Sequence, residues 1–151
     1  MDGSSVILSA FVTAALTAAG TVYVVEGRET VTSAPELARL TLNVAMTHRD
    51  GAAGAHGRRL VYGGQTISIA AAAAARALPG LATIVAWRSC DHPAPVFEGD
   101  ILSTEVAIVA ASRLEHADAT LADLRVNVHA DRGTGEPPEQ VLDWAFVGVL
   151  A

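Results

Sequence analysis

Histidine and its polar neighbours offer the clearest chemistry in this sequence of 151 residues. Four residues separate Asn43 from His48, and a single residue separates His48 from Asp50. An imidazole changes protonation near neutral pH, so His48 is suited to act as a general base. Either Asn43 or Asp50 could orient the ring by hydrogen bonding to one nitrogen, which would leave the other free to take a proton from water. The spacing is loose, and a histidine in a loop is often simply solvated.

A second group of residues precedes the longest predicted helix. Arg58 and Arg59 are followed by Tyr62, Gly63 and Gly64. Paired glycines at a helix N-terminus let a ligand approach free backbone N–H groups at the positive end of the helix dipole. Such groups can stabilise an enolate or an oxyanion, and the two arginines could pair with phosphates. The Lys-Ser/Thr ending of a P-loop is absent, and a tight turn with exposed charges would give the same pattern.

Two further features carry little chemistry by themselves. Cys90 is the only cysteine, so an internal disulfide is excluded and nothing indicates an oxidising compartment. A lone thiol could be a nucleophile, but it is more commonly a small buried hydrophobe, which is the interpretation we adopt. Residues 95–100 (PVFEGD) predict a turn before a strand, in which Gly99 supplies backbone freedom.

The longest helix is predicted at 65–78. Alanine has the highest helix propensity, and six consecutive alanines occupy 70–75 before Pro79 and Gly80 end the helix. Its side chains are small and apolar on nearly every face, which is typical of a helix enclosed by the rest of the protein. Neighbouring backbone could therefore approach it closely.

Strands that pair as hairpins are predicted after this helix. Strand-like composition places them at 81–89, 100–112, 120–130 and 140–150, and apolar residues alternate approximately in the second and more cleanly in the third. Before the helix, the sequence predicts a strand, turn and strand at 21–32, a helix at 34–46 with Ser33 as its N-cap, and a loop at 47–57. This order favours an α+β fold with an antiparallel sheet packed on one helix.

Composition and charge limit the classes of function. Fifty-one percent of the residues are hydrophobic, which excludes an intrinsically disordered chain, and the length fits one domain. The net charge of −6 argues against nucleic acid binding. The apolar segment 6–19 is too short for a membrane span and lacks the basic residues of a signal peptide. We therefore expect it to be a buried element, and expect a cytoplasmic protein without membrane association.

Taken in order, three stretches resemble the MaoC-like family of hot-dog-fold acyl-CoA hydratases and dehydratases. LTLNVAMTHRD (40–50) is similar to the family's catalytic loop, RRLVYGGQTIS (58–68) to its entry into the central helix, and PVFEGD (95–100) to the turn before the next long strand. The wording of these motifs is most similar to that of mesaconyl-CoA-type hydratases. The resemblance covers about 27–112. It implies that 1–151 is a single hot-dog domain, in which an antiparallel sheet wraps a long helix.

The resemblance also implies roles for individual residues. His48 matches the catalytic histidine, and Asn43 stands where many relatives have a catalytic aspartate. Gly63 matches the glycine whose N–H faces the thioester oxygen. Ser68 matches a helix serine that lines this site, and Tyr62 replaces the usual histidine of the motif.

The implied reaction is the reversible addition of water across the α,β double bond of an enoyl-CoA. His48 would accept a proton from water, and the N–H of Gly63 or Gly64 would stabilise the enolate. Asn43 would position the water. Because an amide exchanges no proton at neutral pH, return of a proton to the α-carbon would fall to His48 or to water. Asp50 could instead orient His48.

Binding of the CoA phosphates would fall to Arg58, Arg59 or Arg88, among which the sequence does not select. CoA is part of the substrate, and we expect no other cofactor and no metal. A hot-dog domain commonly pairs its sheet with that of another, so we expect a homodimer or a dimer of dimers.

Three alternatives remain open at this stage. A hot-dog thioesterase would use the same oxyanion contact, usually with a carboxylate on or near the helix, but 65–78 contains neither Asp nor Glu. A non-catalytic subunit that binds acyl chains is favoured by the departures at Asn43 and Tyr62. The third alternative is a plain α+β domain without a site.

Overall fold

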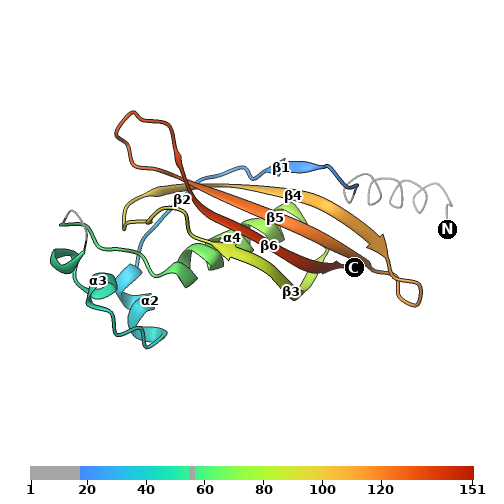
Figure 1. Cartoon of the computed structure of the whole chain (residues 1–151), viewed down its shortest axis with the longest axis horizontal. Coiled ribbons are helices and arrows are strands. Elements are labelled where there is room, and N and C mark those ends of the chain that lie inside the picture. The colour runs from blue at the N-terminus through green and yellow to red at the C-terminus, as the bar shows by residue number, and fades with distance from the viewer. Residues whose placement is uncertain (1–17, 55–56) are drawn as a thin grey trace, which may run out of the picture.

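The computed structural model describes residues 18–54 and 57–151 (Figure 1). The strands are β1 (Val22–Val24), β2 (Glu29–Thr30), β3 (Leu81–Asp91), β4 (Ile101–Arg113), β5 (Thr120–Asp131) and β6 (Glu139–Leu150). The helices are α2 (Ala34–Leu40), α3 (Met46–Arg49) and α4 (Gly63–Ala77), and a 3₁₀ turn follows α3 at Gly51–Ala53. This arrangement confirms the predicted α+β fold class. Apart from its last two residues, the apolar segment 6–19 lies outside the described part of the chain.

The sheet is antiparallel throughout, in the order β1-β4-β5-β6-β3, and β2 also pairs with β4. β3 therefore lies at one edge, and the short strands β1 and β2 share the other. The four long predicted strands are confirmed, each boundary within two residues of its predicted position. The predicted strand, turn and strand at 21–32 are confirmed as β1 and β2.

Alternation along β5 shows why these segments form strands. Successive side chains of a strand point to opposite faces of the sheet. On β5 the buried residues are Ala122, Leu124, Val126, Val128 and Ala130. Arg125, which lies between them, is exposed and pairs with Asp143 on β6. A register slip of one residue would turn the apolar set to solvent, so this pattern determines which face meets the helix.

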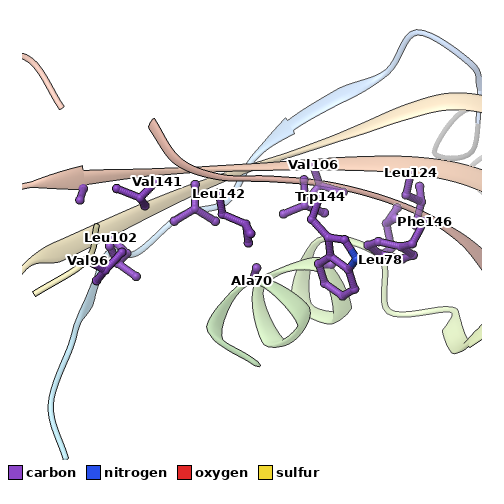
Figure 2. Close-up of a cluster of buried hydrophobic side chains, with 14 of the residues drawn as sticks. Ala70, Leu78, Val96, Leu102, Val106, Leu124, Val141, Leu142, Trp144 and Phe146 are labelled. Carbon is purple, nitrogen blue, oxygen red and sulfur yellow. The ribbon is translucent and has the colours of Figure 1, made fainter. Parts of the chain in front are cut away.

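Helix α4 packs along the apolar face of the sheet, as Figure 2 shows. Ala70, Ala73 and Ala74 of the helix are at most 1% exposed. Trp144 and Phe146 of β6 point from the sheet toward the helix, with ring centroids 4.3 Å apart. Small helix residues leave the space that these two rings fill, and aromatic rings contribute a large share of the apolar area that a core buries.

Two helix predictions differ from the structure. The helix predicted at 34–46 ends at Leu40, because Thr41 bonds back to the carbonyl of Leu37 and Leu42 adopts a left-handed backbone with φ 56°. Ser33 occupies the N-cap position, but its side chain makes no capping hydrogen bond. The long helix begins two residues earlier than predicted, at Gly63. Among the described residues, no helix is long and apolar enough to cross a membrane.

Close packing of α4 against the sheet makes its buried alanines sensitive to added volume. We expect Ala74→Leu to lower the free energy of unfolding by about 1–3 kcal/mol, because overpacking forces strained rotamers or backbone shifts. Ala75→Leu is the matched control, since Ala75 is exposed on the same helix, and should change it by less than about 0.5 kcal/mol. Urea denaturation measures both. Equal effects of the two changes would contradict the packing described here.

Candidate active site

The ring of His48, on α3, is held by the main chain. Its Nδ1 lies 2.9 Å from the carbonyl oxygen of Leu60. A carbonyl oxygen can only accept a hydrogen bond, so the neutral ring carries its proton on Nδ1 and donates it there. Nε2 is thereby left with its lone pair, and His48 is presented as a base at that nitrogen.

Neither Asn43 nor Asp50 holds the ring of His48, contrary to the expectation from their spacing. The side-chain oxygen of Asn43 accepts from the N–H of Ala45 at 3.0 Å, as in an Asx turn. The side chain of Asp50 accepts from the N–H of Ala52 at 2.9 Å and caps the 3₁₀ turn. Both residues therefore shape the backbone on either side of α3 instead of contacting the imidazole.

The segment that holds His48 is itself paired with the chain after β3. Leu60 donates its N–H to the carbonyl of Thr47 at 3.1 Å and forms an isolated β-bridge with Phe97. Beside it, Val61 donates to the carbonyl of Val96 at 2.8 Å. The position of the Leu60 carbonyl is thus set by backbone bonds on both sides.

A buried carboxylate anchors this pairing. Asp100 is 0% exposed, and its oxygens accept from Arg58 Nη2 at 2.6 Å and from the N–H of Phe97 at 2.9 Å. Arg132 adds a second positive group, 3.5 Å from the carboxylate. Both guanidinium groups also lie over the Phe97 ring, at 4.7 and 5.7 Å from its centroid. The PVFEGD turn is therefore a structural anchor, and Gly99 within it has the positive φ (92°) that favours glycine.

The N-terminus of α4 faces the same region. Tyr62 is the N-cap, and its ring meets the ring of His48 edge-on with centroids 6.2 Å apart. A side chain at Gly64 would displace the Tyr62 ring, whose Cζ lies 2.6 Å from the position of a Cβ there. Among the described residues, no acceptor receives the N–H of Gly63 or Gly64, and these groups lie at the positive end of the helix dipole.

A pocket of about 310 Å³ lies between His48 and the start of α4. Ten residues line it, among them His48, Gly63, Thr66 and His92, whereas Tyr62 and Gly64 do not. His48 and the first residue of α4 therefore line one cavity, in which a carbonyl oxygen at the helix end and a water near His48 could be held together. Asn43 does not line this pocket.

Thr66, and not Ser68, lies on the side of α4 that faces this pocket. Residues three apart on a helix share a face, whereas residues five apart are rotated by about 140°. Thr66 is 1% exposed and lines the cavity. Ser68 is exposed, bonds back to the carbonyl of Gly64 at 2.7 Å, and lines a separate hollow with Gln65 and Arg76. The site role expected for Ser68 is therefore not supported.

The three arginines expected to bind phosphate already pair with carboxylates. Arg58 pairs with Asp100, Arg59 with Glu98, and Arg88 with Asp123 at 3.0 Å. Two arginines, Arg49 and Arg76, form no ion pair with a described residue. Arg49 follows His48 on α3 and is exposed, a position that sequence reasoning did not select.

Sequence reasoning also missed His92, which lies directly over Gly63. Its Nε2 is 3.2 Å from where a Cβ on Gly63 would be. The residue lies in the linker 92–99, between the predicted strands 81–89 and 100–112, of which sequence reasoning considered only the PVFEGD turn. A titratable residue next to prolines, in a segment that leads into the PVFEGD motif, was the signal available.

Metal and thiol chemistry find little basis in the described residues. No group of three or more His, Cys, Asp or Glu side chains there could hold a metal ion. Cys90 is half-buried and packs against the core, as expected of a small hydrophobe. Burial, reinforced by the charge of Asp91, raises the pKa of the Cys90 thiol, which disfavours the reactive thiolate.

A long helix enclosed by an antiparallel sheet, with a pocket at the helix N-terminus, defines the hot-dog class of domains. No family model matches the chain. It is 33% identical to mesaconyl-CoA hydratase of Cereibacter sphaeroides over 99 residues, which are 66% of this chain and 28% of that protein. The chain belongs to the MaoC-like hot-dog family of hydratases and dehydratases.

Two solved structures share this fold. RV0216 of Mycobacterium tuberculosis, a conserved hypothetical protein with a double hot-dog fold, is 50% identical with a TM-score of 0.77, over 88% of this chain and 39% of its own. A putative MaoC domain dehydratase from Chloroflexus aurantiacus is 26% identical with a TM-score of 0.78, over 88% and 42%. The chain thus spans less than half the length of each of these three proteins. The assignment of 1–151 to a single domain stays a prediction.

The buried position of Asp100 predicts that its replacement lowers the free energy of unfolding. We expect Asp100→Asn to lower the free energy of unfolding by about 1.5–3 kcal/mol, the range for a hydrogen bond to a charged group. Asp123→Asn is the matched control: it breaks the exposed pair with Arg88, and surface pairs contribute about 0–1 kcal/mol. Thermal and urea unfolding measure both variants. A loss for Asp100→Asn no larger than that for the control would show that the anchor is dispensable.

The raised pKa of the Cys90 thiol predicts that its alkylation requires a higher pH in the native protein than in the unfolded protein. Because the native thiol is less ionised at a given pH, we expect the rate of iodoacetamide labelling to reach its half-maximum at a higher pH in the native protein than in the protein unfolded in urea. The pH midpoint does not depend on how easily the reagent reaches the thiol. It therefore reports the pKa of the thiol and not its accessibility. Coincident midpoints would refute the prediction.

Proposed function

We propose that this protein catalyses the reversible addition of water across the α,β double bond of an enoyl-CoA thioester. The observation that supports this proposal most directly is that His48 and Gly63 line one pocket. The Nδ1 atom of His48 is bonded to the main chain, which leaves the lone pair of Nε2 available to accept a proton. The chain's identity to mesaconyl-CoA hydratase supports the reaction class. The acyl group remains open, and a mesaconyl-type substrate is the one that this relative suggests.

Each group in the pocket has a distinct task. His48 Nε2 takes a proton from the water that attacks the β-carbon, while the Leu60 carbonyl keeps the ring in the tautomer that can do so. Negative charge then develops on the thioester oxygen. The N–H groups of Gly63 and Gly64 stabilise this charge, together with the dipole of α4, and one such donor is worth about 2.7–4 kcal/mol.

A thioesterase is the alternative that uses the same oxyanion contact. Its usual carboxylate is missing from α4, whose sequence is GGQTISIAAAAAARA. Within the described residues, the pocket is also lined by no Asp or Glu. Hydration is therefore the better-supported reaction, and release of free CoA thiol separates the two.

Self-association is part of the proposal. Leu40 at the end of α2 and Leu42 and Val44 after it are each at least 80% exposed. Trp87 on the edge strand β3 is 56% exposed. Apolar exposure on this scale is typical of a surface that meets another protein. We therefore expect a homodimer or a dimer of dimers, located in the cytoplasm where CoA thioesters are used.

The test uses the purified chain with crotonyl-CoA and mesaconyl-CoA. We expect loss of the enoyl absorbance without release of thiol. His48→Gln should reduce kcat at least about 100-fold, which is the lower range for removing a general base. Thiol release by the wild-type protein would favour the thioesterase.

His116→Gln serves as the control, because His116 lies in the turn between β4 and β5, outside the pocket. Its kcat should stay within about twofold of the wild-type value, since it contacts no group assigned to the reaction. Hydration that survives His48→Gln in a folded protein would sink the assignment of the base.

A further inference from the structure

Hydration requires two proton transfers, and the pocket contains two titratable side chains. Of the ten residues that line it, His48 and His92 are the ones whose side chains can both accept and donate a proton as an acid–base pair. We propose that His92 carries the proton at the α-carbon of the acyl thioester, and that the site therefore also exchanges the α-hydrogens of saturated acyl thioesters. This inference rests on the proposed function for the way the thioester lies in the pocket.

The position of His92 relative to the helix supports this role. Its Nε2 and Cε1 lie 3.2 and 3.4 Å from where a Cβ on Gly63 would be, so the edge of the ring faces the start of α4. The thioester oxygen would lie at the N–H groups of Gly63 and Gly64. Of the two carbons that change during hydration, the α-carbon is bonded directly to the carbonyl carbon and is therefore the nearer one to a ring in this position. The β-carbon lies one bond further along the chain.

The backbone around His92 is fixed, whereas its ring is open to solvent. β3 ends at Asp91, which pairs with Asp143 of β6, and Pro93 follows His92 directly. A strand pair on one side and a residue of fixed φ on the other restrict the main chain. His92 is nevertheless exposed, so its ring can exchange protons with bulk water after each turnover.

The proton count balances with these two residues. In hydration, neutral His48 removes a proton from water as the C–O bond forms at the β-carbon, and the π electrons move to give the enolate. Protonated His92 then donates its proton to the α-carbon, and the thioester carbonyl re-forms. His48 ends protonated and His92 neutral, and solvent resets both. Asn43 does not line the pocket and as an amide has no proton to give.

A saturated acyl thioester isolates the step assigned to His92. Neutral His92 removes an α-hydrogen, the N–H groups at the helix end stabilise the enolate, and His92 returns a deuteron in D₂O. The net change is replacement of hydrogen by deuterium, with no oxidant and no leaving group. Because no water is added, this exchange does not require His48.

The experiment compares wild-type protein with His92→Gln, His48→Gln and His116→Gln. Mass spectrometry follows deuterium uptake at the α-carbon of butyryl-CoA in D₂O, and absorbance follows hydration of crotonyl-CoA. We expect His92→Gln to reduce exchange at least about 100-fold and to lower kcat for hydration with KM within about threefold. His48→Gln should lose hydration but keep exchange within about threefold, and His116→Gln should keep both.

Each outcome discriminates. Exchange by the wild-type protein without hydration would refute the proposed function and leave the role of His92 intact. Hydration without exchange, neither activity, or undiminished exchange in folded His92→Gln would overturn the role of His92. An increase in KM with kcat unchanged would also overturn it, because this would show a binding contact only. Circular dichroism and thermal unfolding establish that each variant is folded.

Discussion

A single carboxylate withdrawn from water, that of Asp100, sets the geometry on which the site depends. An unpaired buried charge costs several kcal/mol, so its partners must stay in place. Those partners are Arg58 and the N–H of Phe97. Because Asp100 binds Arg58, the segment before α4 lies alongside the PVFEGD turn. The Leu60 carbonyl then lies against His48, and α4 begins beside the same pocket.

Small residues on the helix and large ones on the sheet make a complementary pair. The alanines at 70, 73 and 74 bring the backbone of α4 close to the sheet, and the Trp144 and Phe146 rings fill what space remains. This packing holds the buried side of α4 against the sheet (Figure 2). An N-terminus held in this way can present its free N–H groups at a constant position, which electrostatic stabilisation of a developing charge requires.

The fold was largely predictable because periodicity reports burial directly. Strand-like composition, with alternation in the second and third strands, predicted the four long strands to within two residues, and the alanine run predicted α4. The helix predicted at 34–46 was too long because apolar residues at helical spacing continue from Leu40 to Val44, and both of these residues are exposed. In isolation, spacing does not distinguish a face that packs inside the domain from one that is open to solvent or to another chain.

The candidate site was less predictable because its contacts join segments distant in sequence. His48 and Gly63 were selected from motif and position, but the partners of Asn43, Asp50 and the nominated arginines depend on loop geometry. Ser68 was misplaced because helix phase was not applied to it. The orienting contact of His48 comes from a main-chain oxygen, which every residue type possesses. The contact to His48 should therefore survive most substitutions at position 60. Proline is the exception, because it lacks the N–H that donates to the carbonyl of Thr47. The orientation of the imidazole depends on the path of the main chain and not on the side chain at position 60. It should therefore survive substitutions that would remove a side-chain contact.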